Sequence, residues 1–276
     1  MTAVSSKAKP WALVTGASAG IGAEFCRQLA LHDYRLVLVA RREVKLDSLA
    51  QELRESFSTE SRIYPLDLSR SDAGAELAGW LEAEDIEIEF LVNNAGYGLP
   101  GYYTDSDWTG HAKFIQVMVT AVCDMTWRLL PGMQSRRRGF VINVASLAGI
   151  VPSMAGHTLY GAAKAFLVRF SESLALENQS TGVQVSALCP GFTYSEFHDV
   201  TGTRELVNKL PAWMWMSAAE VVAHGIQSVT RSPPRVVAIP GFVNRIIANL
   251  MRYLPASLAW WMIRWFSSRI RHSPAD

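Results

Sequence analysis

Residues 15–22 read TGASAGIG and stand between a short apolar run and a helical pattern. Their glycines are spaced G-x-x-x-G-x-G, and glycine lets a backbone turn sharply and approach another group closely. The N-terminus of the following helix offers free N–H groups to an anion. This loop is therefore predicted to bind the pyrophosphate of a dinucleotide. Its candidate contacts are Gly16, Ser18, Gly20, Ile21 and Gly22.

Strand-like runs alternate with helical patterns on both sides of this loop, and the helical patterns include 43–57 and 159–178. Several of the runs are apolar on both faces, as in a parallel sheet covered on both sides. The expected strands are WALVTG (11–16), RLVLVA (35–40), EFLVNN (89–94), GFVINVAS (139–146), VQVSALCPG (183–191) and RVVAIPG (235–241). We therefore predict an α/β fold, a single Rossmann-type doubly wound parallel sheet, with a dinucleotide-binding catalytic domain at 1–240 and an amphipathic C-terminal helical extension at 241–276.

Composition limits the classes of partner. The chain is 49% hydrophobic and 18% charged, with a net charge of +1, so it is a folded globular protein with no sign of nucleic-acid binding. Cys26, Cys123 and Cys189 lie far apart, without metal-ligand spacing, and are expected to be buried, reduced thiols in the cytoplasm. We expect no metal site. No uncharged apolar run reaches the length of about 18 residues that a membrane-spanning helix needs.

The end of the second expected strand bears on which dinucleotide is bound. A carboxylate there would bind the adenosine ribose and repel a 2′-phosphate. This chain instead has Arg41 and Arg42 after Ala40. Guanidinium groups match a phosphate in charge and geometry, so we predict that the cofactor is NADP(H). The alternative is that both arginines are solvated side chains at the end of a strand and bind no phosphate.

A second motif, HTLYGAAKAF (157–166), places Tyr160 and Lys164 one helical turn apart on a shared face. Ser146 ends an expected strand at the same edge of the sheet. A substrate carbonyl could accept hydrogen bonds from Ser146 and Tyr160 while the phenol supplies a proton. A free phenol has a pKa of about 10. We expect the Lys164 ammonium to lower that of Tyr160 and to bind the nicotinamide ribose.

Taken together, these motifs resemble the short-chain dehydrogenase/reductase family over residues 10–240. The resemblance rests on TGASAGIG, LDLS (66–69), NNAG (93–96), Ser146, YGAAK and PGFTYSEF (190–197). It implies that Asp67 lies beside the adenine. It further implies cofactor contacts from Asn94, Ala95, Gly96, Pro190, Gly191, Phe192 and Thr193. We also expect a homodimer or homotetramer.

The chain departs from the family pattern at two positions. Family members often carry an asparagine thirteen residues before the proline of a P-x-M ending, and counting back from Pro131 reaches Met118. A thioether cannot replace an amide as a hydrogen-bonding group, which puts the family's proton relay in doubt. Gln116 is two residues away, on another side of the helix. Ser195 stands where threonine is commoner and keeps the hydroxyl.

The C-terminal stretch is basic and rich in tryptophan. Residues 221–276 hold seven arginines, no lysine and one acid, Asp276. The apolar positions of an amphipathic helix are Leu258, Trp261, Met262, Trp265 and Phe266, with Arg264 and Arg271 on the other side. Three uses stay open: a lid on its own domain, a dimer interface, or contact of residues 241–272 with a membrane surface.

Two functions follow from these features. The first is an NADPH-dependent reductase of carbonyl groups (or the reverse reaction) on an apolar small-molecule substrate, with Tyr160 as the acid/base. The second is a non-catalytic NADP(H)-binding regulator that uses the fold and the tail to bind partners. Retention of Ser146, Tyr160 and Lys164 favours the enzyme.

Overall fold

The computed structural model describes residues 9–196 and 211–270, with backbone only at 266 and 268–270. Parts of three sequence predictions therefore lie outside the described residues. These are the end of the PGFTYSEF motif at 197, the side chain of Phe266, and the tail from Arg271 onward.

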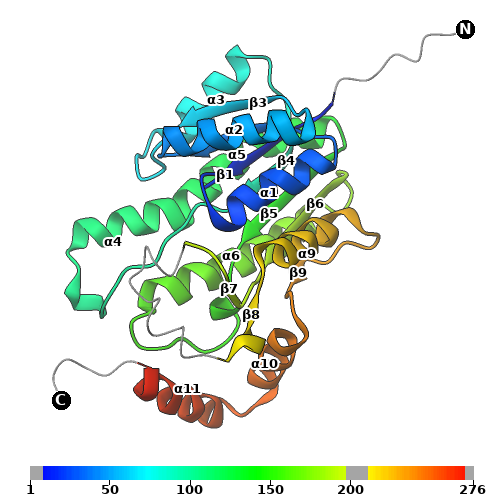
Figure 1. Ribbon diagram of the computed structural model, residues 1–276. Coiled ribbons are helices and arrows are strands. Elements are labelled where there is room, and N and C mark those ends of the chain that lie inside the picture. Colours follow the sequence, from blue (N-terminus) through cyan, green and yellow to red (C-terminus); the bar gives the residue numbers. More distant parts are fainter. Residues whose placement is uncertain (1–8, 197–210, 271–276) are drawn as a thin grey trace, which may run out of the picture.

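Seven parallel strands form the central sheet in the order β3-β2-β1-β4-β5-β6-β9 (Figure 1). Their bounds are β1 Trp11–Thr15, β2 Arg35–Ala40, β3 Ser61–Pro65, β4 Ile88–Asn93, β5 Gly139–Val144, β6 Val183–Leu188 and β9 Val237–Ala238. The predicted α/β fold with one doubly wound parallel sheet is confirmed. β3 was not predicted, and the run expected at 235–241 forms a strand only at its two β9 residues.

Helices cover both faces of this sheet. Helices α1 (Gly20–Leu31), α2 (Glu43–Phe57) and α9 (Ala218–Thr230) pack on one face. The opposite face carries α3 (Ala73–Ala83), α5 (Ala121–Ser135) and α6 (Thr158–Glu177), and α4 (Trp108–Ile115) precedes α5 through a π-helical turn at Gln116–Thr120. Burial on both faces explains why the central strands are almost continuously apolar.

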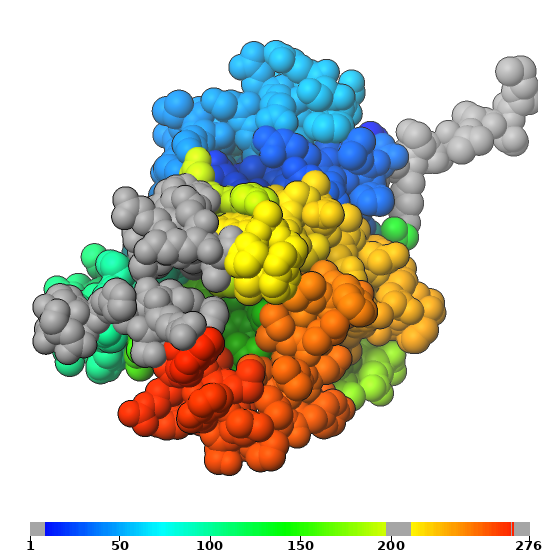
Figure 2. All heavy atoms as spheres, turned by 60° about the horizontal axis from the view of Figure 1, so that its bottom comes forward, coloured from blue at the N-terminus to red at the C-terminus, as the bar shows by residue number. Residues whose placement is uncertain are grey.

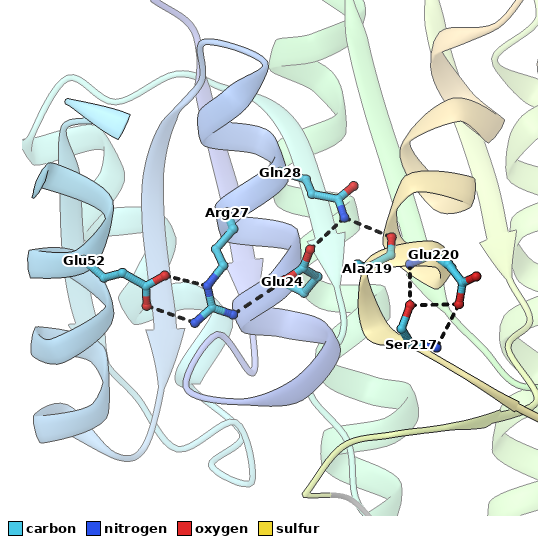
Figure 3. A network of polar contacts seen from close by, with 7 residues as sticks. All are labelled: Glu24, Arg27, Gln28, Glu52, Ser217, Ala219 and Glu220. Atoms are coloured by element: carbon cyan, nitrogen blue, oxygen red, sulfur yellow. Dashed lines mark hydrogen bonds and ion pairs between the residues drawn. The ribbon is translucent and has the colours of Figure 1, made fainter. Parts of the chain in front are cut away.

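Polar contacts join two helices on the first face. The Gln28 side chain donates a 2.9 Å hydrogen bond to the carbonyl of Ala219 at the start of α9 (Figure 3). Ser217 and Glu220 form a capping box there, which satisfies N–H groups at the helix N-terminus. The Gln28 hydrogen bond thus ties α1 to the start of α9, and α9 itself packs on β5 and β6.

The strand order reverses between β1 and β4, where ligands of open parallel sheets bind. The carboxyl ends of β1, β4 and β5 meet at this edge and lead into the glycine loop, the NNAG motif and Ser146. A small parallel pair, β7 (Phe192–Thr193) with β8 (Trp215–Met216), stands beyond β6. The topology thus gathers the predicted motifs at one edge.

The C-terminal extension consists of two helices, α10 (Phe242–Tyr253) and α11 (Ala256–Ile270), at the lower end of the molecule in Figure 1. The amphipathic helix expected through 258–266 lies within α11, and Pro255 separates it from α10, because a proline ring cannot continue the α10 backbone. In α11 the most buried described side chain is Ala259, while Met262 and Ile263 are half-buried. The buried face of α11 therefore runs through Ala259 and Ile263, one residue along the helix from the predicted apolar positions, which began at the exposed Leu258.

Two further sequence predictions bear on the fold. Across the part of the chain that the structure describes, no helix combines the length and hydropathy needed to cross a bilayer. Cys26 and Cys189 are buried and Cys123 is half-buried, all as free thiols. Burial is therefore confirmed for two of the three cysteines.

Candidate active site

The loop after β1 has no room for a side chain at two of its glycine positions. Gly16 has a φ of +66°, and a Cβ there would lie 2.8 Å from the Asn94 side chain. A Cβ on Gly22 would lie 2.2 Å from the carbonyl oxygen of Gly16. The first turn of α1 contains no acidic residue and no side chain caps its N–H groups. The loop thus fits an anionic pyrophosphate, and its residues would hold one at the helix N-terminus.

Thr15 and Asn94 fix the shape of this loop. The Thr15 hydroxyl accepts hydrogen bonds from the backbone N–H groups of Asn94 and Ala95, at 2.9 and 3.0 Å, and donates to the Val92 carbonyl. The Asn94 side-chain amide donates to the carbonyls of Thr15 and Gly16. Asn94 therefore braces the loop through its side chain, a role beyond the cofactor contact that the family resemblance implies.

Basic groups gather at the end of β2. The Arg42 guanidinium donates to the Ser18 hydroxyl through Nε and Nη2, at 3.2 and 3.0 Å, and pairs with Glu196 through Nη1 at 3.0 Å. Lys45, on the first turn of α2, pairs with the same carboxylate at 2.7 Å. A hydrogen bond from the backbone N–H of Ser69 is the main reason that the pKa of Asp67 is lowered. The charge of the exposed Arg41 lowers this pKa further.

One cavity of about 970 Å³ connects these groups. All of the predicted cofactor contacts line it except Gly22, which is buried beneath the loop. The lining also includes Ser146, Tyr160 and Lys164, so the structure brings the predicted catalytic and cofactor residues together in a single space.

Strand β5 and helix α6 position the predicted catalytic side chains. Ser146 follows β5, and its hydroxyl accepts a hydrogen bond from the Ala148 N–H at 3.2 Å. Tyr160 lies on the first turn of α6, and Lys164 is buried one turn later. The Lys164 Nζ lies 5.7 Å from the centre of the Tyr160 ring and donates a 2.7 Å hydrogen bond to the Val144 carbonyl.

Burial dominates the protonation of these groups. It raises the pKa of Tyr160, and a hydrogen bond with Ser146 acts in the opposite direction. Burial lowers the pKa of Lys164 to about 8. The net direction of the Tyr160 pKa shift is therefore opposite to the lowering that we expected, because desolvation has the largest influence on the phenol.

Met118 occupies the family's asparagine position within the π-helical turn. Its side chain is 1% exposed and packs with Phe114, Ala163 and the partly buried Tyr160. A Cβ on Gly96 would lie 2.9 Å from the Met118 sulfur. The Gln116 side chain instead points toward the carbonyl of Arg70, which confirms its separation from Met118. The position is thus filled by an apolar side chain in tight contact.

The C-terminal extension lines part of the cavity, mainly with apolar side chains. Figure 2 shows the orange and red helices around a hollow with green residues at its floor. The contributors from α10 and α11 are Ile247, Leu250, Met251, Trp261, Met262, Ile263, Trp265 and Ser267. Three roles were left open for the C-terminal extension: a lid on its own domain, a dimer interface or a membrane contact. These contacts are those of an extension that packs against its own domain.

Several residues at the site were missing from the sequence prediction. Thr15 could have been found from its place at the carboxyl end of β1, beside the glycine loop. Lys45 could have been found from helical periodicity, one turn beyond the arginines. The ion pairs of Glu196 could not have been predicted from a local pattern, because its partners are about 150 residues away in the sequence.

Comparisons with known proteins agree with this geometry. The family profile described as short chain dehydrogenase matches residues 10–205. A very-long-chain 3-oxoacyl-CoA reductase of Homo sapiens is 33% identical over 248 residues, 88% of this chain and 76% of the relative. The corresponding reductase of Laccaria bicolor is 34% identical over 211 residues, 76% of this chain, and the match spans 62% of that relative's length.

Solved structures match over nearly the whole fold. A 7beta-hydroxysteroid dehydrogenase structure superposes with a TM-score of 0.81 at 26% identity, covering 92% of this chain and 96% of that one. A short-chain dehydrogenase from Sphingobium yanoikuyae in complex with NADPH gives 0.76 at 30% identity, covering 89% and 96%. With the matched profile and the shared sheet, the chain belongs to the short-chain dehydrogenase/reductase family of NAD(P)-dependent oxidoreductases that act on CH–OH groups.

Proposed function

We propose that this protein is an NADPH-dependent reductase of a carbonyl group carried on a long apolar substrate. The observation that carries the proposal is the continuity of one cavity, from the glycine loop through Ser146, Tyr160 and Lys164 to the apolar wall of α10 and α11. A cofactor, a reacting carbonyl and an apolar chain would each meet suitable groups along it.

The mechanism assigns a distinct task to each side chain. When bound, NADPH supplies the hydride that adds to the carbonyl carbon. Ser146 orients the carbonyl oxygen by donating a hydrogen bond, and Tyr160 donates its phenolic proton to that oxygen. The alcohol is then complete, and the phenolate regains a proton from solvent. Lys164 holds a buried positive charge one turn behind, which favours the phenolate that forms during reduction.

The choice of NADPH over NADH rests on charge at the end of β2. Arg41, Arg42 and Lys45 lie there, and the residue directly after Ala40 is Arg41 instead of a carboxylate. The Ser18 hydroxyl, already bonded to Arg42, adds a neutral donor. Two guanidinium groups and an ammonium favour a phosphate monoester over a ribose hydroxyl.

The substrate class rests on the far end of the cavity. Its wall of methionine, leucine, isoleucine and tryptophan side chains suits an extended hydrocarbon chain. Relatives at 33% and 34% identity are named very-long-chain 3-oxoacyl-CoA reductases. We therefore propose a 3-oxoacyl thioester of long chain length as the substrate.

A direct assay tests this proposal. NADPH oxidation would be followed by absorbance with a series of 3-oxoacyl-CoA thioesters of increasing chain length, a steroid ketone and a short aldehyde. We expect the KM to fall as the acyl chain lengthens, because each added methylene is worth about 0.8 kcal/mol when fully buried. If NADPH binds tightly but no carbonyl is reduced, the non-catalytic regulator becomes the better account.

We also propose that α10 and α11 place a cytoplasmic protein against an anionic membrane surface. Phe242, Ile246, Leu250 and Tyr253 are exposed and recur at helical spacing, so they form one stripe along α10. Both helices also carry exposed arginines, Arg245 and Arg252 in α10 and Arg264 in α11, and the sequence from 221 to 275 holds no acidic residue. Exposed aromatics with arginine and no acid complement anionic lipid headgroups.

Vesicle sedimentation tests the membrane contact. The full chain should bind vesicles containing phosphatidylglycerol more tightly than pure phosphatidylcholine, and Tyr253→Ser with Phe242→Ser should reduce that binding. Equal partition to both vesicle types would contradict the proposal. A concentration-dependent mass by light scattering that these substitutions abolish would instead assign the stripe to a dimer, in keeping with the predicted homodimer or homotetramer.

A further inference from the structure

Glu196 occupies the cluster of cations that the proposed function assigns to the cofactor's phosphate. Both of its carboxylate oxygens are engaged, one by Arg42 Nη1 at 3.0 Å and the other by Lys45 Nζ at 2.7 Å. All three side chains are about 45% exposed, so water reaches the pairs. Such partly exposed pairs are weak and can exchange partners.

The chain leading to Glu196 lies directly over the glycine loop. A Cβ on Gly20 would stand 3.0 Å from the Cβ of Ser195. Ser18, Arg42 and Glu196 all line the same cavity as the predicted pyrophosphate loop. The carboxylate is therefore an internal anion placed at the adenosine end of the cofactor space.

The donors around this carboxylate suit a dianionic phosphate equally well. Arg42 directs Nε and Nη2 to the Ser18 hydroxyl and offers Nη1 to the anion. Lys45 adds an ammonium from the first turn of α2. A guanidinium and an ammonium that meet on one anion, with a hydroxyl bonded to the same guanidinium, are donors that suit a phosphate monoester. A carboxylate uses the same donors with half the charge.

We propose that Glu196 is an internal competitor of the cofactor's 2′-phosphate and that Lys45 is a third basic ligand of that phosphate. This inference rests on the proposed preference for NADPH. Binding of a 2′-phosphate must displace the carboxylate from Arg42 and Lys45, or accept its repulsion at close range. Glu196 thereby lowers the affinity for NADPH while leaving NADH unaffected, and so sets how strongly the protein discriminates between them.

The experiment uses the full chain and two small probes, 2′,5′-ADP and 5′-AMP, which differ by the phosphate in question. Dissociation constants would be measured by calorimetry for wild type and Glu196→Gln at low ionic strength. We expect the variant to bind 2′,5′-ADP about three- to tenfold more tightly, the range that loss of two exposed ion pairs allows, with 5′-AMP unchanged. At about 1 M NaCl the gain should largely vanish, because exposed charges are then screened.

A matched control is available elsewhere on α2. Glu52 pairs with Arg27 at 2.6 Å, and both side chains are exposed to a similar degree (Figure 3). Neither residue lines the cavity. Glu52→Gln removes the same charge from the protein, and we expect it to leave both dissociation constants unchanged. Adding Lys45→Gln to Glu196→Gln should reverse the gain for 2′,5′-ADP.

The outcomes separate this inference from the cofactor proposal. If wild type prefers 2′,5′-ADP and Glu196→Gln shows the same or weaker affinity for it, the competitor role is overturned and the NADPH preference stands. If neither wild type nor the variant prefers 2′,5′-ADP to 5′-AMP, both ideas fall. A preference that appears only in the variant supports the inference and shows that Glu196 masks the site in the wild type.

Discussion

Lys164 on α6 is hydrogen-bonded through Nζ to the carbonyl of Val144, the last residue of β5, at 2.7 Å. Ser146 follows two residues after that carbonyl, and Tyr160 precedes the lysine by one helical turn. The single bond thus connects the strand that carries the serine to the helix that carries the tyrosine. A buried cation therefore sets the relative position of the two groups that would contact a substrate carbonyl.

The low pKa of Lys164, about 8 against 10.5 for the free side chain, makes protein stability depend on pH. Between these values the unfolded chain binds a proton that the folded chain lacks, so wild-type stability rises with pH. The cost of burying the charge is fully present below pH 8 and is relieved as the pH rises toward 10.5. The stability of Lys164→Met relative to wild type should therefore fall by about 2–3 kcal/mol across this range.

Urea denaturation of both proteins, near the two ends of that range, measures the change. Loss of the hydrogen bond to Val144 shifts the difference between the two proteins by a constant amount and does not create its pH dependence. A stability difference that stays constant with pH would contradict a buried lysine with a lowered pKa.

Tyr160→Phe removes the proton donor and keeps the ring that packs beside Met118 and Ala163. We expect kcat to fall by about 10²- to 10⁴-fold, the usual contribution of a general acid. NADPH binding, followed by cofactor fluorescence, should change little because the glycine loop and the arginines are untouched. Full activity in this variant would show that another group supplies the proton.

The elements that could be predicted from the sequence are those in which buried apolar residues recur at a regular spacing. Helix α2 lies at the expected 43–57, since its leucines recur on one face, and the central strands are apolar because helices cover both sides. Strand β3 escaped prediction because Ser61, Arg62 and Pro65 are poor strand residues. It lies at the sheet edge, where backbone pairing with β2 compensates for its side chains.

The site was predictable wherever the chemistry lies in local motifs. Gly16, Tyr160 and Lys164 each stand in a short pattern whose spacing has a physical meaning. The Glu196 pair with Arg42 joins distant segments, and no local pattern encodes it. The direction of the Tyr160 pKa shift depends on how deeply α6 is packed, which a four-residue spacing does not reveal.

Replacing Arg41 and Arg42 together by alanine tests cofactor choice. The substitution removes two guanidinium groups from the end of β2, and we expect NADPH affinity to fall by about 10- to 100-fold, the effect of losing one or two hydrogen bonds to a charged group. NADH affinity should change by much less, because it has no 2′-phosphate. Titration of both cofactors by fluorescence makes the comparison. Equal losses would place the arginines away from the phosphate.

Two neighbouring residues of α11 separate substrate contact from surface contact. Met262 lines the cavity and is half-buried, whereas Trp260 is 62% exposed and is not part of the lining. Met262→Ala should raise the KM of a long-chain substrate by about three- to thirtyfold, from the loss of some 1–2 kcal/mol of apolar contact. Trp260→Ala should leave that KM unchanged. Equal effects of the two substitutions would show that α11 does not contact the substrate chain.

Met118 stands at the position where members of the family often carry an asparagine. Its 1% exposure and its contacts with Phe114 and Ala163 leave an asparagine there without an evident polar partner. An unsatisfied buried amide costs about 1–3 kcal/mol, so Met118→Asn should lower stability. Met118→Leu is the matched control, since a volume-conserving exchange costs less than about 1.5 kcal/mol.

Thermal melts and solvent isotope effects on turnover distinguish a dry position from a proton route. For Met118→Asn we expect a lower Tm, by about 2–4 °C per kcal/mol lost. The isotope effect should equal that of wild type and of Met118→Leu, because protons reach Tyr160 without passing this position. The opposite result is a variant that is equally stable, turns over faster and is less sensitive to heavy water. That result would mean that the asparagine restores a proton relay, and that Met118 limits the rate of the enzyme.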